Sequence, residues 1–409
     1  MTRASSALPA SPEARVFGPG LVLVLVMLTA LTPLTTDMYL AAFPQMAVEF
    51  SASASMVQLT LTALMVGAGV GQLVIGPLSD SVGRRRLLLV CIAICLVAGV
   101  ICALAPSVQV LIVARLVQGL TGGAGMVLGR AVIADRTSGP ATMRLMNALI
   151  AAGAISAAVA PALGGQIIQW SGWRAVFWVL SGIVGAMLLA SAFAVPESLT
   201  PEKRRSTGFV EFSRGIGELL RNPRFVAYLV AGIGGSGAFF AYLAGSPFVI
   251  QDYLGFGVRG FSIIFTLNAV GLVLVAMASM RLAGRVHAHT LVRIGLGIVI
   301  TGSAALLLLT YAGVPTMPVL VILFAIVASQ GLIMGNTMGL AVDQGLHRAG
   351  SGSALAGALP FAFAAVVMPI AGLGYQPRTL AIVMLVCSLV ALVPVLWAPV
   401  AAEQEALGA

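Results

Sequence analysis

The sequence predicts an all-α membrane protein with twelve transmembrane helices in two pseudo-symmetric six-helix halves. Of its 409 residues, 59% are hydrophobic and only 9% are charged, whereas a soluble domain carries about 25% charged residues. The hydrophobic residues form continuous runs of about 20, which is the length that crosses a bilayer as a helix. These runs lack the period-two alternation of a transmembrane β-barrel.

Twelve apolar runs, each bounded by polar, proline or glycine clusters, mark the expected helices. In chain order they are 18–43, 54–77, 86–105, 108–133, 143–168, 173–195, 224–250, 260–281, 290–312, 316–340, 352–374 and 378–400. Residues 1–17 are polar, and no short apolar core with a small-residue cleavage site follows them. We therefore expect a short cytoplasmic tail there rather than a cleaved signal peptide.

The longest polar stretch divides the chain into three parts. We expect an N-terminal six-helix half over 1–195, a cytoplasmic linker over 196–223, and a C-terminal six-helix half with a short tail over 224–409. The linker carries both signs of charge and is expected to lie on the inner membrane surface, or to bind a regulatory partner. An acid closes the same helix in each half, Asp135 in the fourth helix and Asp343 in the tenth. Two related halves favour a transporter whose site lies at their interface near the midplane.

The distribution of basic residues predicts the orientation. With the N-terminus inside, the loops on the outer side contain only Arg174, Arg259 and Arg378. Apart from Arg115, the other arginines and the lysine fall on the inner side, so both termini are expected to be cytoplasmic. The net charge of +9 therefore reflects membrane topology and not nucleic-acid binding.

Two ionised side chains, Asp37 and Arg115, fall well inside the apolar segments. A charge at membrane depth costs at least a few kcal/mol, so such residues are usually functional. Asp37 lies seven positions before Pro44 and Arg115 lies eight after Ser107. Because the first and fourth helices run in opposite directions, the two charges are expected at similar depth.

This pair of charges suggests proton-linked transport. Asp37 is expected to bind and release protons as the site is exposed to each side in turn. Arg115 is expected either to pair with Asp37 or to hold backbone carbonyls and a water chain, and Gln118 shares that network. The alternatives are a hydrated carboxylate at a helix end and a purely structural arginine that ties the fourth helix to the first.

Several motifs resemble those of the major facilitator superfamily. The stretch Gly76–Arg86 matches its loop signature between helices 2 and 3. Arg115-Leu-Val-Gln118-Gly119 resembles the helix-4 signature of its proton-driven members, and Gly153–Gly165 resembles the helix-5 antiporter signature of drug exporters. Further details resemble the Bcr/CflA group of drug:proton antiporters, which includes bicyclomycin and chloramphenicol/florfenicol exporters; they are Thr36–Leu40 followed by Pro44, Gly172–Arg174, Pro196–Leu199 and Gly350–Gly357.

The resemblance implies a proton-coupled exporter of amphipathic compounds in the bacterial inner membrane. It supports Asp37 as the residue that binds protons and cationic or polar substrate groups. The helix-5 signature here departs from the family pattern, because Ala160 precedes Pro161. The direction of transport is therefore inferred from resemblance and not from this motif alone.

The loop signature has a mechanical interpretation as a cytoplasmic gate. Gly76 and Gly83 allow close approach and turning. Asp80 is expected at the N-terminus of the eleventh helix, near Gly350–Gly352, where the helix dipole is positive. Arg84 is expected to pair with Asp135, so that these contacts join the halves in the outward-open state. Alternatively, the charged side chains of this loop only set the membrane topology. We favour this interpretation for Arg85 and Arg86.

The helix-5 signature concerns shape. Gly153, Gly164 and Gly165 are small residues at helical spacings, and Pro161 removes one backbone hydrogen bond. We expect close packing against the eighth helix and a kink that acts as a hinge, although a generic small-residue packing face explains the same pattern.

The expected cavity is apolar and aromatic with sparse polar groups, which suits amphipathic molecules of drug size. Its candidate residues are Tyr39, Gln58, Gln72, Gln118, Met126, Phe239, Phe240, Tyr242, Asn268 and Asn336. Ordinary helix packing is the alternative for each of them.

The sequence offers little for other chemistry. His287 and His289 have no acid or cysteine nearby, and the four cysteines lie in apolar runs without other metal ligands. There is no phosphate-binding glycine loop and no nucleophile–base pair. We expect a monomer without metal or cofactor that is not an enzyme and uses the proton gradient, with protons, small molecules and the lipid bilayer as partners. The alternatives are a proton-coupled uptake symporter, an exporter of an endogenous metabolite and a non-transporting membrane sensor.

Overall fold

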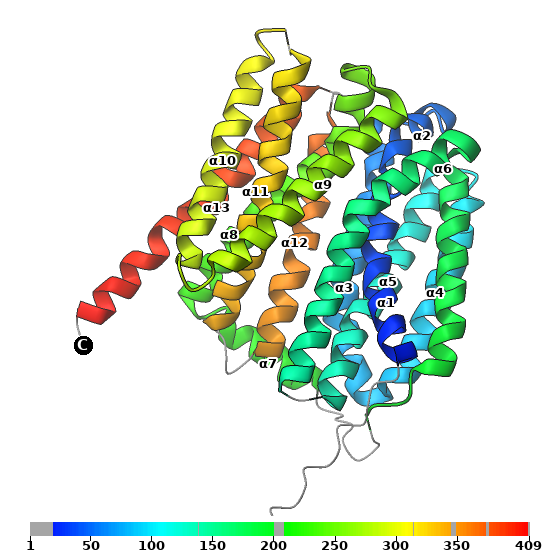
Figure 1. Cartoon of the computed structure of the whole chain (residues 1–409), viewed down its shortest axis with the longest axis vertical. Coiled ribbons are helices and arrows are strands. Elements are labelled where there is room, and N and C mark those ends of the chain that lie inside the picture. The colour runs from blue at the N-terminus through cyan, green and yellow to red at the C-terminus, as the bar shows by residue number, and fades with distance from the viewer. Residues whose placement is uncertain are drawn as a thin grey trace, which may run out of the picture.

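The computed structural model describes residues 19–137, 139–199, 208–313, 315–344, 349–373 and 376–407. These residues form a bundle of long helices (Figure 1), and the β-structure among them is one isolated bridge between Ala283 and Val286. In this part of the chain, eleven helices are long and apolar enough to cross a membrane. The all-α membrane fold is therefore confirmed. The expected tail and residues 200–207 of the expected linker lie outside the described residues.

The first half of the chain supplies seven elements. They are α1 (Pro19–Asp37), η1 (Leu40–Ala42), α2 (Phe43–Glu49), α3 (Ala54–Val82), α4 (Arg84–Ala103), α5 (Val108–Arg136) and α6 (Pro140–Ala194). The 55 residues of α6 contain two helices that meet at Gly172, which has φ 76° and ψ 175°. A positive φ suits glycine. Because the two helices on either side of Gly172 are counted together as one apolar helix, the twelve predicted helices correspond to the eleven of the structure.

The span predicted over 18–43 is confirmed by the candidate span Gly20–Glu49, but it is not one continuous helix. In the structure α1 ends at Asp37, a turn follows, and the short helices η1 and α2 continue the chain to Glu49. Proline at the start of α2 explains the new beginning, because Pro44 needs no hydrogen-bond acceptor for its nitrogen there. The break leaves carbonyl groups at the end of α1 free for other donors.

The second half follows a short connecting helix, α7 (Gly208–Leu219). Its elements are α8 (Pro223–Phe248), η3 (Val249–Tyr253), α9 (Gly257–Leu282), α10 (Ala288–Leu309), α11 (Thr316–Asp343), α12 (Ala349–Ala371) and α13 (Pro377–Leu407). The helix α7 packs against both α3 and α12. The bounds of α6 and α8 agree with a division near 195 and 224, although the independence of the two halves stays a prediction.

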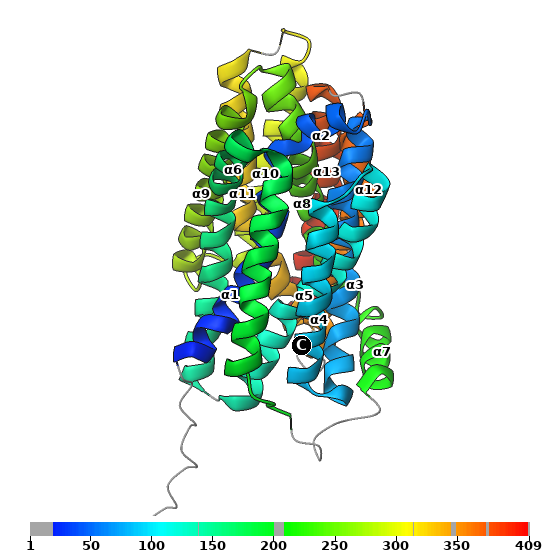
Figure 2. The same cartoon turned by 90° about the vertical axis from the view of Figure 1, so that its right-hand side faces the viewer.

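The two sets of helices stand side by side, with α2 at one end of the bundle and α7 at the other (Figures 1 and 2). We call these the α2 end and the α7 end. The halves meet where α6 packs on α9 and α3 packs on α12, and where η1 and α2 contact α8. Packing of the fifth predicted helix against the eighth is therefore confirmed, since these are the first part of α6 and α9.

Candidate functional site

Arg115 of α5 is fully buried within the first half. Its Nη2 donates to the carbonyl oxygen of Thr35 at 2.9 Å, and its Nη1 donates to Oε1 of Gln118 at 2.8 Å. The guanidinium carbon lies 4.0 Å from the ring centroid of Tyr39 and 5.4 Å from that of Phe177. A planar cation over an aromatic face is stabilised by the ring quadrupole. The charge is thus held by a carbonyl, an amide and two rings.

The break in the first span makes this arrangement possible. Thr35 lies in the last turn of α1, where carbonyl groups have no partner within the helix and carry the negative end of the helix dipole. Tyr39 follows in the turn, and its hydroxyl shares a hydrogen bond with Oγ1 of Thr60 in α3 at 3.3 Å. The expectation that Arg115 holds backbone carbonyls is therefore confirmed, and Arg115 lies at the depth of Asp37, as predicted.

Asp37 ends α1 and is 9% exposed. Within the described ranges it forms no ion pair, so the alternative in which Arg115 pairs with it is not the arrangement in this structure. On the opposite half, Tyr242 of α8 lies near Asp37. The hydroxyl of Tyr242 accepts a hydrogen bond from Nδ2 of Asn268 in α9 at 2.7 Å. Asp37 therefore faces a polar pair across the interface, with no arginine bound to its carboxylate.

Aromatic rings surround the polar pair. Phe265 stacks on Tyr242 with ring centroids 5.5 Å apart, and Phe239 lies 6.5 Å from the same ring. Phe240 packs on Phe361 of α12 at 5.7 Å. The predicted residues Phe239, Phe240 and Tyr242 thus belong to one aromatic cluster of the second half.

Other predicted cavity residues have different positions. Gln58 is fully buried and donates its Nε2 to the carbonyl of Ala244 in α8 at 2.8 Å. Asn336 of α11 donates a hydrogen bond to the hydroxyl of Ser279 in α9 at 2.8 Å. Ser279 lies about 16 Å along α9 from Asn268. Gln72 lies against Gly357 of α12, and Met126 is half-buried on α5. In the described part of the chain, these side chains thus contact different helices of the bundle.

Two hollows lie at the α2 end, away from Asp37. One, of about 530 Å³, is lined by Pro44, Gln45, Val48, Glu49, Gly172 and Trp173. The other, of about 400 Å³, lies beside it between the end of α2 and the start of α5. Glu49 there accepts a hydrogen bond from Nε1 of Trp173 at 2.6 Å and pairs with Arg174. None of the predicted cavity residues lines either hollow.

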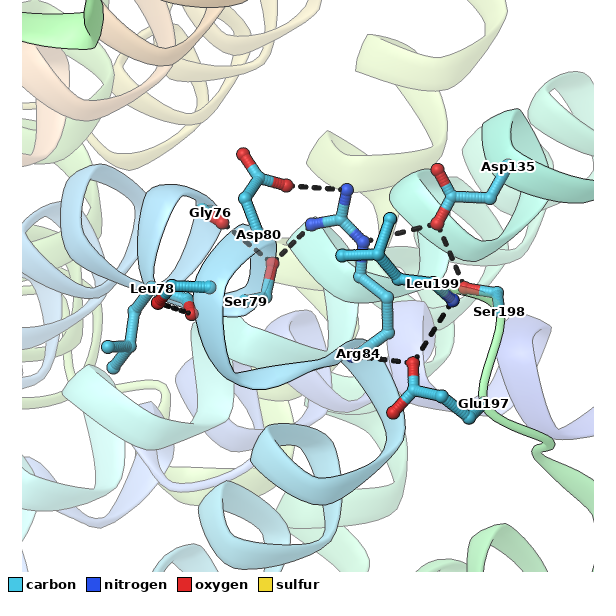
Figure 3. A network of polar contacts seen from close by, with 10 residues as sticks. Gly76, Leu78, Ser79, Asp80, Arg84, Asp135, Glu197, Ser198 and Leu199 are labelled. Atoms are coloured by element: carbon cyan, nitrogen blue, oxygen red, sulfur yellow. Dashed lines mark hydrogen bonds and ion pairs between the residues drawn. The ribbon is translucent and has the colours of Figure 1, made fainter. Parts of the chain in front are cut away.

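At the α7 end the loop signature forms a polar cluster around Arg84 (Figure 3). Its guanidinium pairs with Asp80 at 2.7 Å and with Asp135 at 3.2 Å, and it also donates to Ser79. The predicted pair of Arg84 and Asp135 is confirmed. The contact of Asp80 with the start of α12 stays a prediction, because the structure shows Asp80 bound to Arg84.

The segment after α6, which was expected only as the start of the linker and as part of the family resemblance, completes this cluster. Glu197 accepts hydrogen bonds from the backbone N–H groups of Arg84 and Arg85 at 2.9 and 3.3 Å. Ser198 donates to Asp135 at 2.9 Å. Glu197 therefore caps the N-terminus of α4, which begins directly after Gly83 at φ 107°. We call Ser79, Asp80, Arg84, Asp135, Glu197 and Ser198 the loop cluster.

The helix-5 signature places two glycines where no side chain fits. A Cβ on Gly164 would lie 1.9 Å from the carbonyl oxygen of Met38, directly after Asp37. A Cβ on Gly165 would lie 1.9 Å from Oγ of Ser262 in α9. Gly153 has more room, since its nearest neighbour is a methyl group of Thr29 at 3.9 Å. The dihedral angles of α6 stay helical at Pro161, so its role as a hinge stays a prediction.

Comparison with known proteins agrees with this architecture. Residues 25–369 match the family model described as Major Facilitator Superfamily. The chain belongs to the major facilitator superfamily. It is therefore a membrane transporter and not an enzyme, as the sequence analysis predicted.

Several known proteins are similar to this transporter over most of its length. It is 37% identical over 358 residues to the uncharacterized MFS-type transporter YdgK of Bacillus subtilis, covering 86% of this chain and 88% of the relative. It is 29% identical over 349 residues to the bicyclomycin resistance protein homolog of Haemophilus influenzae, covering 85% and 87%. It is 31% identical over 288 residues to the chloramphenicol resistance protein of Pseudomonas aeruginosa, covering 70% and 67%. These relatives agree with the predicted resemblance to the Bcr/CflA group.

Solved structures confirm the fold of the facilitator. The partially occluded inward-open form of the xylose transporter XylE from E. coli superposes with a TM-score of 0.70 at 15% identity, covering 92% of this chain and 96% of that one. A bacterial homolog of the human lysosomal transporter Spinster, in an inward-facing conformation, gives a TM-score of 0.69 at 14% identity, covering 96% of each chain.

Proposed function

We propose that this transporter exports amphipathic compounds in exchange for protons and that Asp37 carries the proton. The observation that supports this most directly is the position of Arg115, whose guanidinium is bound to Thr35 and Gln118 instead of to Asp37. A carboxylate near the centre of a membrane protein needs a compensating partner. Since no basic side chain of the described residues supplies one, the partner of Asp37 is a proton or a group of the substrate.

Competition for one carboxyl group gives the exchange. A proton that arrives from outside neutralises Asp37 and releases the substrate. After the transporter opens to the cytoplasm, the proton leaves and a new substrate molecule binds. Arg115 holds the end of α1 in place through its bond to the Thr35 carbonyl, two residues before this carboxyl group.

The surroundings of Asp37 support a particular class of substrate. Tyr242 and Asn268 provide polar groups on the facing half, and the rings of Phe239 and Phe265 lie beside them. Such a site suits a compound with an aromatic or apolar body and a hydrogen-bond donor or cation. Relatives named for bicyclomycin and chloramphenicol resistance support antibiotics of those kinds as substrates.

The loop cluster joins residues of the first half and the segment after α6, not the two halves, and it lies at the end where we place the cytoplasmic gate. Gly76, Gly83 and the pairs formed by Arg84 fix the turn between α3 and α4 at the α7 end. We place this end and both termini in the cytoplasm of a bacterial inner membrane, because the basic residues concentrate there. The protein works as a monomer without a cofactor, by rocking residues 1–195 against 224–409 around Asp37.

Transport by the purified protein in liposomes with an imposed pH gradient tests this function. Labelled chloramphenicol is expected to move against its own gradient, in the direction opposite to proton flow. An uptake symporter would move it in the same direction as the protons. Transport of an endogenous metabolite but of no antibiotic in the panel would replace the proposed substrate class, and absence of flux for every compound would favour a sensor.

A further inference from the structure

Two glutamine side chains join the halves at the α2 end. Gln58 of α3 donates Nε2 to the carbonyl oxygen of Ala244 in α8 at 2.8 Å. Gln251 of η3 donates Nε2 to the carbonyl oxygen of Ala41 in η1 at 3.0 Å. The first bond runs from the first half to the second, and the other runs in the opposite direction. Both glutamines are buried.

The packing around these bonds closes the same end. Gly372, at the end of α12, lies so close to Gln58 that a Cβ on it would be 1.6 Å from Oε1. The rings of Phe43 and Phe248 face each other across the interface with centroids 6.1 Å apart. In contrast, the loop cluster at the α7 end connects residues of the first half with one another and with the segment after α6.

Both glutamines connect directly to the surroundings of Asp37. The acceptor Ala41 lies four residues after Asp37, in the short helix that follows the break. Gln58 lies two residues before Thr60, whose hydroxyl is bonded to Tyr39, and the ring of Tyr39 covers the guanidinium of Arg115. A movement that breaks the glutamine bonds therefore also moves the segment directly after Asp37, which contains Tyr39 over the guanidinium of Arg115.

We propose that Gln58 and Gln251 form a latch that holds the α2 end closed, and that their release opens the path from that end to Asp37. This inference rests on the proposed alternating-access function. An amide donor suits this role, because a hydrogen bond to a carbonyl holds two helices together without placing a charge in the membrane. It is also weak enough to break in each cycle.

Spin labels on the two halves measure the opening directly. Val48 in α2 and Leu373 after α12 are both exposed, and the four native cysteines are buried. In a Val48→Cys and Leu373→Cys background, pulsed electron resonance reports the distance between the halves at the α2 end. The test variants are Gln58→Met and Gln251→Met, which keep the side-chain length and remove the donor. The matched control is Gln109→Met, since Gln109 is exposed at the same end.

Wild type is expected to give mainly a short distance between the labels. In each test variant the population with a longer distance should rise about five-fold, because one net hydrogen bond changes an equilibrium by roughly that factor. The control should match wild type. If both test variants keep the wild-type distribution, the latch is wrong.

A second route uses Gly372→Ala, whose added methyl displaces Gln58 without removing its amide. The longer distance should again gain population, and an unchanged distribution would also count against the latch. The distance is measured without substrate or pH gradient. A failure of the latch is therefore distinct from a failure of proton-coupled export, which the liposome assay measures.

Discussion

The guanidinium of Arg115 is bound to the carbonyl of Thr35, two residues before Asp37, and not to the carboxylate of Asp37 itself. This relationship depends on the end of α1 at Asp37, which leaves the Thr35 carbonyl free. Arg115 and Asp37 therefore have separate roles, which a direct ion pair between them would combine. Arg115 holds the broken segment in place, and Asp37 keeps a carboxyl group that can exchange its partner.

The first prediction concerns Arg115. Replacement with lysine keeps the charge but loses the planar stacking on Tyr39 and one of the two directed hydrogen bonds. We expect Arg115→Lys to lower the free energy of unfolding by about 1–3 kcal/mol and to reduce transport. Thermal unfolding in detergent measures the first effect. A variant with wild-type stability and transport would show that any cation suffices at this position.

A second prediction concerns the glycine that packs against the broken segment. Gly164→Ala places a methyl group within 1.9 Å of the Met38 carbonyl, so the segment after Asp37 must move. We expect a loss of more than about 2 kcal/mol in unfolding free energy. Gly182→Ala, in the same long helix with nothing within 4 Å of its Cβ, is the matched control and should be neutral or slightly stabilising. Equal effects of both substitutions would contradict the packing role of Gly164.

The loop cluster supports a third prediction. In Glu197→Ala the backbone N–H groups of Arg84 and Arg85 lose their acceptor, and the first turn of α4 loses its cap. Hydrogen–deuterium exchange of the peptide that contains these two amides should become several-fold faster. Arg86→Ala is the control, because that side chain is exposed and removes no acceptor. Unchanged exchange in Glu197→Ala would show that the turn is fixed without the segment after α6.

The number and approximate limits of the helices were predictable because each lipid-spanning segment leaves a long apolar run. The break after Asp37 was not predicted, because residues 38–43 are apolar and continue the run. Only Pro44 marks the new start. The pairing of Arg84 with Asp135 was predictable from the loop motif, whereas Glu197 was missed because its contact joins residues more than a hundred positions apart.

The candidate site, like the fold, was only partly predictable from the sequence. The depth of Asp37 and Arg115 followed from their distances to the helix ends, but the choice of Thr35 as the partner of Arg115 depends on the unexpected break. Gln58 was predicted as a cavity residue from its polarity alone. Its contact with Ala244 forms between two helices of different halves. The apolar pattern of one helix does not predict which residues of the other half it will meet.

Proton movement in inverted membrane vesicles tests the central claim, that Asp37 exchanges a proton for substrate. The comparison is wild type against Asp37→Asn, with Asp343→Asn as a control because Asp343 is exposed at the end of α11. Asp37 forms no ion pair among the described residues, so its replacement should leave the fold intact. Addition of chloramphenicol should alkalinise the lumen with wild type and the control but not with Asp37→Asn. Equal alkalinisation by folded Asp37→Asn would contradict the account.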